Sequence, residues 1–135
     1  MSKREKQDGS ALIEFAGSLM LLAALLTGIF RVGYTFYVYD TLVNSVRAGV
    51  RYASLRPADP DLARSVRNLV VYGEPRPTAG TKPLAPGLRP ENVELALEPA
   101  AATVSLRGYE IDSLFSKVRL DGRPTVTFPV TGEVR

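Results

Sequence analysis

An uncharged apolar run near the N-terminus constrains this chain more than any other feature. From Ala11 to Phe30, 15 of 20 residues are apolar, and no charged residue occurs between Phe15 and Phe30. About 20 residues of α-helix span the hydrocarbon core of a bilayer. A helix buried inside a soluble protein would need apolar partners on every side, and the rest of this 135-residue chain is not apolar enough to supply them. We therefore expect Phe15–Tyr34 to be a transmembrane helix.

The residues that flank this run predict its orientation. Lys3, Arg4 and Lys6 precede it, and positive charge of this kind stays on the cytoplasmic side. Aromatic residues suited to the opposite membrane interface follow the run: Tyr34, Phe36, Tyr37 and Tyr39. A secretory signal peptide has a shorter apolar run and a small-x-small cleavage site, which Thr27–Arg31 does not provide. We expect a single-pass protein with its N-terminus inside and its remainder outside.

The absence of Cys and His limits the kinds of active site and metal site that this chain can form. The chain has no Cys, which excludes disulfides, thiolate metal sites and Cys nucleophiles. It has no His, which removes the commonest general base and the usual zinc ligands. We expect no catalytic residue, no cofactor and no metal centre. A hydrolase that uses only carboxylates is a distant third interpretation.

The net charge of +3 arises in the middle of the chain. Residues 31–72 carry six arginines against three aspartates, whereas residues 73–135 carry eight charges of each sign. Scattered arginines on a helix face explain this excess, and we expect no nucleic-acid binding. The outer carboxylates lack the regular spacing of a calcium loop and are interpreted as solvated charge: Glu91, Glu94, Glu98, Glu110, Asp112 and Asp121.

Glu14 is an anomaly at the start of the apolar helix. A carboxylate that enters a bilayer unpaired costs several kcal/mol, so such residues are usually functional and have a partner. Glu14 would alternatively mark the headgroup boundary, or favour the positive N-terminal end of the helix. The sequence at this point leaves both interpretations open.

The segment around Glu14 resembles the processing site of type IV prepilins, in which a glycine and four residues precede a glutamate and an apolar helix. The resemblance implies that a prepilin peptidase cuts between Gly9 and Ser10, where glycine would present a slim, extended backbone. The new Ser10 ammonium and Glu14 would then share one helical face. In a filament, Glu14 would neutralise the N-terminal amine of a neighbouring subunit. Ser10 departs from the aromatic or Met residue often found first in mature pilins, so N-methylation does not follow.

The helix is expected to continue beyond the membrane, because no proline occurs before Pro57. A helix from Ser10 to about Leu55 would be roughly 70 Å long. Apolar residues recur every four positions at Leu42, Val46 and Val50, with Arg47 and Arg51 on a neighbouring face. A parallel stripe of small residues would allow close approach of another element, either within the domain or between subunits: Thr41, Ser45, Gly49 and Ala53.

The end of this helix resembles TadE-like proteins, in which the segment after the membrane helix closes on Gly-x-Arg-Tyr-Ala. Here that signature is Gly49, Arg51, Tyr52 and Ala53. With Gly9–Phe15 and Tyr34–Tyr39, the resemblance covers residues 9–54. TadE-like proteins are minor pilins or pseudopilins of the tight-adherence (type IVc, Tad/Flp) pilus, which serves surface adhesion.

The resemblance implies several partners and a location. The partners are a prepilin peptidase, other pilins, the pilus assembly platform and the lipid bilayer, with homo- or hetero-oligomers formed through the N-terminal helix. The location is the bacterial cytoplasmic membrane, then the surface pilus after assembly. The alternative function is an unprocessed single-pass binding module or a secretion or assembly adaptor.

The remaining chain divides by composition. We assign residues 1–9 to a leader, 10–56 to the long helix, 57–73 to a short helix, 74–91 to a Pro/Gly-rich loop and 92–135 to a sheet. For the short helix, Asp59 is expected as N-cap, Pro60 in the first turn and Gly73 as the stop. Its apolar face is Leu62, Val66, Leu69 and Val70, opposite Arg64, Arg67 and Asn68.

Alternating apolar residues predict three short antiparallel strands near the C-terminus. Their inward positions are Val93, Leu95 and Leu97, then Val104 and Leu106, then Val126, Phe128 and Val130. Pro124 and Pro129 favour an edge position for the last strand, and Asp121-Gly122 is expected as a turn. A helical turn or packed loop is expected at Ile111, Leu114, Phe115 and Val118. The predicted fold is α+β, membrane-anchored and pilin-like, with the sheet packed on the outer half of the long helix.

Overall fold

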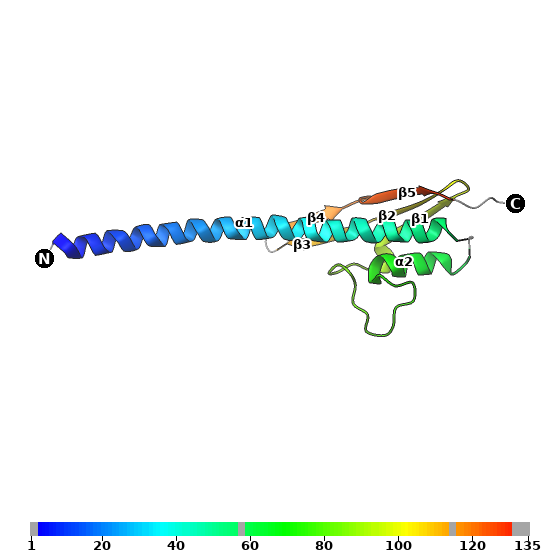
Figure 1. Cartoon of the computed structure of the whole chain (residues 1–135), viewed down its shortest axis with the longest axis horizontal. Helices are drawn as coiled ribbons and strands as arrows, with labels where there is room; N and C mark the ends of the chain where they lie inside the picture. Colours follow the sequence, from blue (N-terminus) through cyan, green and yellow to red (C-terminus); the bar gives the residue numbers. More distant parts are fainter. Residues whose placement is uncertain (1–2, 57–58, 114–115, 131–135) are drawn as a thin grey trace. The chain divides into compact units, whose positions relative to one another are not determined.

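The structure is a computed structural model that describes residues 3–56, 59–113 and 116–130, with side chains for residues 9–56, 59–112 and 117–130. It forms two compact units, Met1–Tyr34 and Thr35–Arg135. Figure 1 shows the elements along the chain: α1 (Lys3–Ser54), α2 (Leu62–Tyr72), the 3-10 helix η1 (Pro90–Asn92), β1 (Val93–Glu98), β2 (Ala101–Leu106), β3 (Tyr109–Ser113), β4 (Ser116–Leu120) and β5 (Thr125–Pro129). This arrangement confirms the predicted α+β class.

The long helix α1 is continuous and ends where the sequence predicts. It begins at Lys3, so the leader assigned to residues 1–9 is largely helical too. In its C-terminal part, Leu42, Val46 and Val50 are completely buried, whereas Arg47 and Arg51 are exposed. The four-residue period therefore marks the core face of the second unit, as predicted.

The second helix begins two residues later than the sequence suggested. Asp61, not Asp59, occupies the N-cap position, and no side chain caps the helix there. The Asp59 carboxylate instead accepts a hydrogen bond from the Asp61 N–H, which makes a local turn before the helix. Gly73 ends α2 as predicted: it has φ of 78° and its N–H donates to the Leu69 carbonyl.

Gly49 is the point of closest packing against α2. A Cβ placed on Gly49 would lie 2.5 Å from Val70 Cγ2 and 3.5 Å from Val66 Cγ1. Ser45 and Ala53 on the same stripe are also buried. The small residues thus allow close packing inside this chain. Of the two roles that the sequence left open, contact within the domain and contact between subunits, Gly49 has the first.

The Pro/Gly-rich segment after α2 is an irregular loop with pinned ends, and Figure 1 shows it extending outward beside α2. The Leu84 N–H donates to the Val71 carbonyl, and the Tyr109 hydroxyl donates to the Pro86 carbonyl. Ala85 and Leu88, which belong to the loop, are buried. The loop is therefore held at its start by the hydrogen bond from the Asn68 amide to the Pro75 carbonyl and along its second half, whereas residues 76–83 are mostly exposed.

Three strands form the predicted antiparallel sheet, in the order β1-β2-β5. Along β2, Ala102, Val104 and Leu106 are completely buried and alternate with half-buried residues. These side chains, α2 and the C-terminal part of α1 together supply the core of the second unit. Strand β5 lies at an edge, as its prolines predicted.

The segment from Tyr109 to Leu120 forms a second two-stranded sheet, so the expected helical turn at Ile111 and Val118 is wrong. The two residues are cross-strand partners, and Leu114 and Phe115 lie outside the described residues. The three- and four-residue spacing of apolar residues suggested a helix. The decisive signal was the charged residues between them, which pair across the strands as Glu110 with Arg119 and Asp112 with Lys117.

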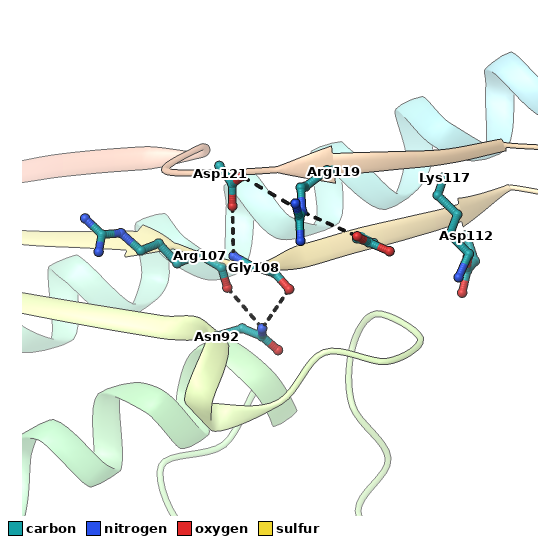
Figure 2. A network of polar contacts seen from close by, with 8 residues as sticks. Asn92, Arg107, Gly108, Asp112, Lys117, Arg119 and Asp121 are labelled. Atoms are coloured by element: carbon teal, nitrogen blue, oxygen red, sulfur yellow. Dashed lines mark hydrogen bonds and ion pairs between the residues drawn. The ribbon is translucent and has the colours of Figure 1, made fainter.

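The two sheets meet at a hydrogen-bonded junction, drawn in Figure 2. The Asn92 amide donates to the carbonyls of Arg107 and Gly108, and the Gly108 N–H donates to the Asp121 carboxylate. Gly108 has φ of 63°, and this left-handed conformation turns the chain from β2 into β3. Asp121-Gly122 forms the matching bend between β4 and β5, as predicted.

Candidate functional site

The helical segment that begins at Gly9 presents an apolar surface that no part of the described chain covers. Gly9–Ser54 is the one helix in the described residues that is long and apolar enough to cross a membrane, with a mean hydropathy of 2.0 over its most apolar 18 residues. None of those residues is buried. Ile13 and Met20, for example, are each 75% exposed. By length and composition, this segment is suited to lipid or to other apolar helices.

The backbone and the Thr27 hydroxyl of this segment form hydrogen bonds within the helix itself. The backbone forms a continuous helix, and the Thr27 hydroxyl donates to the Ala23 carbonyl one turn earlier. Phe30 and Tyr34 stack with ring centroids 6.5 Å apart. A helix whose backbone groups pair internally is the form that a single chain segment can adopt in hydrocarbon.

The expected cleavage point, Gly9 and Ser10, lies within α1 and is exposed. A Cβ added at Gly9 would meet nothing within 4 Å. The extended backbone expected at Gly9 is wrong for this structure, because the helix continues through it from Lys3. The bond between Gly9 and Ser10 is thus sterically open but held in a helix, which a peptidase would have to unwind locally.

Glu14 is exposed and lies four residues after Ser10, on the same helical face. Within residues 9–56 its carboxylate forms no hydrogen bond and no ion pair. In the uncut chain Ser10 has no ammonium group to offer it. The Glu14 carboxylate therefore lies at the start of an apolar surface and has no cationic partner among the side chains of residues 9–56.

Comparison with known protein families gives one match. Residues 9–51 match the family model described as TadE-like protein. Residues 9–51 are TadE-like. The matched segment begins at Gly9, contains Glu14 and extends through Arg51, so it joins the apolar half of α1 to the half that carries the core of the second unit. The match associates the chain with the Tad pilus. No curated protein and no solved structure matches the chain.

The residues that end the TadE-like helix have distinct positions. Gly49 and Ala53 are buried, and Gly49 faces α2. Arg51 is exposed. Tyr52 is half-buried, and the Arg56 guanidinium lies 4.1 Å from the centre of its ring. In this chain, two residues of the signature, Gly49 and Ala53, therefore contribute to packing. Tyr52 makes a cation–aromatic contact.

Arg56 is the residue in this region that sequence reasoning missed. The signal was its distance from Tyr52: Arg56 follows Tyr52 by four residues, just past the end of α1, where its guanidinium can reach back over the ring. Its position matters because it places a fixed guanidinium at the end of α1.

Four of the six outer carboxylates that were weighed as calcium ligands lie beside cations. Glu94 pairs with Arg107 at 3.1 Å, and Arg119 lies 3.4 Å from Glu110 and 4.0 Å from Asp121. Asp112 pairs with Lys117 at 3.6 Å. Figure 2 shows Arg119 joined to Asp121 by a dashed line. These are exposed pairs, and pairs of this kind contribute about 0–1 kcal/mol to stability.

Proposed function

We propose that this protein is a minor pilin of a tight-adherence (type IVc) pilus. It is inserted as a prepilin with its N-terminus in the cytoplasm, cut between Gly9 and Ser10 by a prepilin peptidase, and built into a surface filament. The observation that carries this proposal is the TadE-like helix, in which an uncovered apolar surface begins beside Glu14, a carboxylate with no ion pair among residues 9–56. The proposed partners are the peptidase, other pilins and the assembly platform.

Cleavage would create a charged partner for Glu14 that the described side chains of α1 do not supply. Hydrolysis of the peptide bond after Gly9 leaves an ammonium group on Ser10. A carboxylate at the centre of a membrane helix costs about 2.5–3.5 kcal/mol on insertion scales, and pairing with a cation reduces this cost. When apolar helices from several subunits pack together, Glu14 of one subunit and the Ser10 amine of another would neutralise each other in a water-poor environment.

The helical backbone at Gly9 is compatible with cutting because glycine is a weak helix residue. Glycine in a helix interior is about 1 kcal/mol less favourable than alanine. The helix would therefore open more easily there than at its apolar neighbours. The leader residues Lys3, Arg4 and Lys6 would hold the opened bond at the anionic cytoplasmic surface.

The mature N-terminus tests this proposal. We expect mass spectrometry of the membrane fraction and of sheared surface filaments to identify Ser10 as the first residue. Gly9→Leu should leave the full-length chain uncut. Gly17→Leu is the matched control, because a Cβ at Gly17 also meets nothing within 4 Å, and it should be cut normally. Met1 or Ser2 as the first residue of every molecule would contradict the proposal.

The alternative function is an unprocessed membrane-anchored binding module or assembly adaptor. The helix that runs uninterrupted through Gly9 favours it. This alternative predicts that Gly9→Leu leaves surface attachment of the cells unchanged. The minor-pilin proposal predicts that the same substitution abolishes the protein's presence in filaments.

A further inference from the structure

An open hollow lies where the end of α1 meets the loop that follows α2. Its volume is about 520 Å³, and its lining residues are Tyr52, Arg56, Glu74, Pro75 and Arg76. This size falls within the range of roughly 300–1,000 Å³ that is typical of ligand clefts. The hollow lies entirely within the second unit and is remote in sequence from Gly9 and Glu14.

Both walls of the hollow are held in place by specific contacts. On the α1 side, the Arg56 guanidinium packs over the Tyr52 ring at 4.1 Å. On the loop side, the Asn68 amide donates a hydrogen bond to the Pro75 carbonyl at 3.3 Å. This bond fixes the backbone between Glu74 and Arg76. A guanidinium that is already positioned loses less side-chain entropy when it binds a ligand.

The arginines of the hollow differ from the cations of the sheets. Arg107, Lys117 and Arg119 each pair with a carboxylate. Arg56 and Arg76 form no ion pair with any residue in the described ranges, although Glu74 lines the same hollow. Over the whole loop, residues 74–91, three basic residues stand against two acidic ones, and the hollow itself is lined by two arginines and one glutamate. The hollow is thus a positively charged site with two guanidinium groups available to an anion.

The residue types in the hollow select among anions. A guanidinium binds a carboxylate through two parallel hydrogen bonds. The Glu74 carboxylate repels ligands with a denser charge than one carboxylate per sugar ring, such as double-stranded nucleic acids, heavily sulfated polymers or a phospholipid surface. It accepts hydrogen bonds from hydroxyl groups. A uronic acid ring meets both requirements, because it carries one carboxylate and several hydroxyls. We propose that this hollow binds a uronic acid unit of an acidic polysaccharide, with Arg56 and Arg76 on the carboxylate and Glu74 on ring hydroxyls.

The experiment measures binding of polygalacturonate to the full-length chain in detergent at an ionic strength of about 0.15 M, where long-range charge attraction is screened. Neutral dextran and dextran sulfate are the comparison polymers. We expect binding of polygalacturonate, weaker binding of dextran sulfate and no binding of dextran. Arg56→Gln and Arg76→Gln should each weaken polygalacturonate binding by about tenfold or more, since a charged hydrogen bond is worth about 1.5–3 kcal/mol.

Two control variants separate this site from diffuse attraction. Arg64 and Arg67 are exposed arginines on α2 outside the hollow, and Arg64→Gln and Arg67→Gln should change binding by less than about twofold. Glu74→Gln should weaken polygalacturonate binding but strengthen dextran sulfate binding. Equal losses in all four arginine variants would overturn the proposal. So would tighter binding of dextran sulfate than of polygalacturonate to the unmodified chain, or no binding of polygalacturonate.

Discussion

The two parts of α1 have the same secondary structure but different surroundings. In the segment from Gly9 to Phe30 every described side chain is exposed, and the segment is almost entirely apolar. From Val38 to Ser54, the apolar side chains at Leu42, Val46 and Val50 are completely buried against the rest of the second unit. The second part has its partners within the chain. The first part has no such partners among the described residues.

This difference teaches that sequence hydrophobicity and burial are separate properties. The more apolar part of the helix is the one that the chain itself does not cover, because the outer region has only enough apolar surface for one face of a helix. Substitutions in the first part should therefore change assembly, whereas substitutions in the second part should change folding. Four predictions test this division, from the largest expected effect to the smallest.

The strongest test is Glu14→Ala, in the uncovered part of the helix. We expect normal cutting at Ser10 but at least a tenfold loss of the protein from filaments, since removing one partner of a buried ion pair costs about 3–5 kcal/mol. Immunoblots of sheared filaments and mass spectrometry of the N-terminus measure the two steps. Glu98→Ala, at an exposed position on β1, is the control. Normal incorporation of the Glu14 variant would instead favour its placement at the headgroup boundary.

Leu42→Ala and Leu22→Ala compare the same substitution in the two parts of α1. Leu42 is completely buried, and Leu22 is 53% exposed. Leu42→Ala should lower the free energy of unfolding by about 2–5 kcal/mol, because it leaves a cavity in the core. Leu22→Ala should change it by less than about 0.5 kcal/mol. Guanidinium unfolding in detergent, followed by tyrosine fluorescence, gives both values, and similar losses would remove the distinction between the two parts.

Gly49→Ala and Gly28→Ala make the comparison at two helical glycines. A Cβ at Gly49 would clash with Val70, which is β-branched and stiff, whereas a Cβ at Gly28 meets nothing within 4 Å. Overpacking costs about 1–3 kcal/mol, so Gly49→Ala should destabilise the second unit. Gly28→Ala should be neutral or stabilise the helix by up to about 1 kcal/mol. The double variant Gly49→Ala with Val70→Ala should recover part of the loss, and thermal unfolding measures this recovery. If the two losses simply add, the clash with Val70 is not the cause of the destabilisation.

The smallest effect concerns the junction between the sheets. Asn92→Ala removes the donor to the carbonyls of Arg107 and Gly108, and we expect a loss of about 1 kcal/mol in the free energy of unfolding. Glu94→Gln removes the exposed pair with Arg107 and should cost less than about 0.5 kcal/mol. Neither variant should change cutting at Ser10. A larger loss for Glu94→Gln than for Asn92→Ala would show that charge pairing, and not the junction, holds the sheets together.

Much of the fold follows from periodicity in the sequence. The end of α1, the cap at Gly73 and the three-stranded sheet were predicted because each rests on local rules of spacing and backbone geometry. The hairpin of β3 and β4 was mistaken for a helical turn. Ile111 and Val118 fit both patterns, and only the pairing of Glu110 with Arg119 across the strands distinguishes them.

The functional residues also divide into those that the sequence predicted and those that it could not predict. Gly9, Glu14 and the apolar run are adjacent in sequence, so their relation could be predicted, and the TadE-like match covers them. The hollow could not be predicted, because Tyr52 and Arg56 lie about twenty residues from Glu74 and Arg76, and only the packing of α2 brings them together.

By itself, the sequence determined the long helix, its apolar N-terminal part and the three strands of the larger sheet, because these depend on the properties of neighbouring residues. Only the tertiary structure decided that Gly49 is a contact with α2, that the helix runs unbroken through Gly9, and that Arg56 and Arg76 line one hollow. Contacts between distant segments depend on how closely their backbones approach. That distance is set by the shape of the whole core, which no single segment encodes.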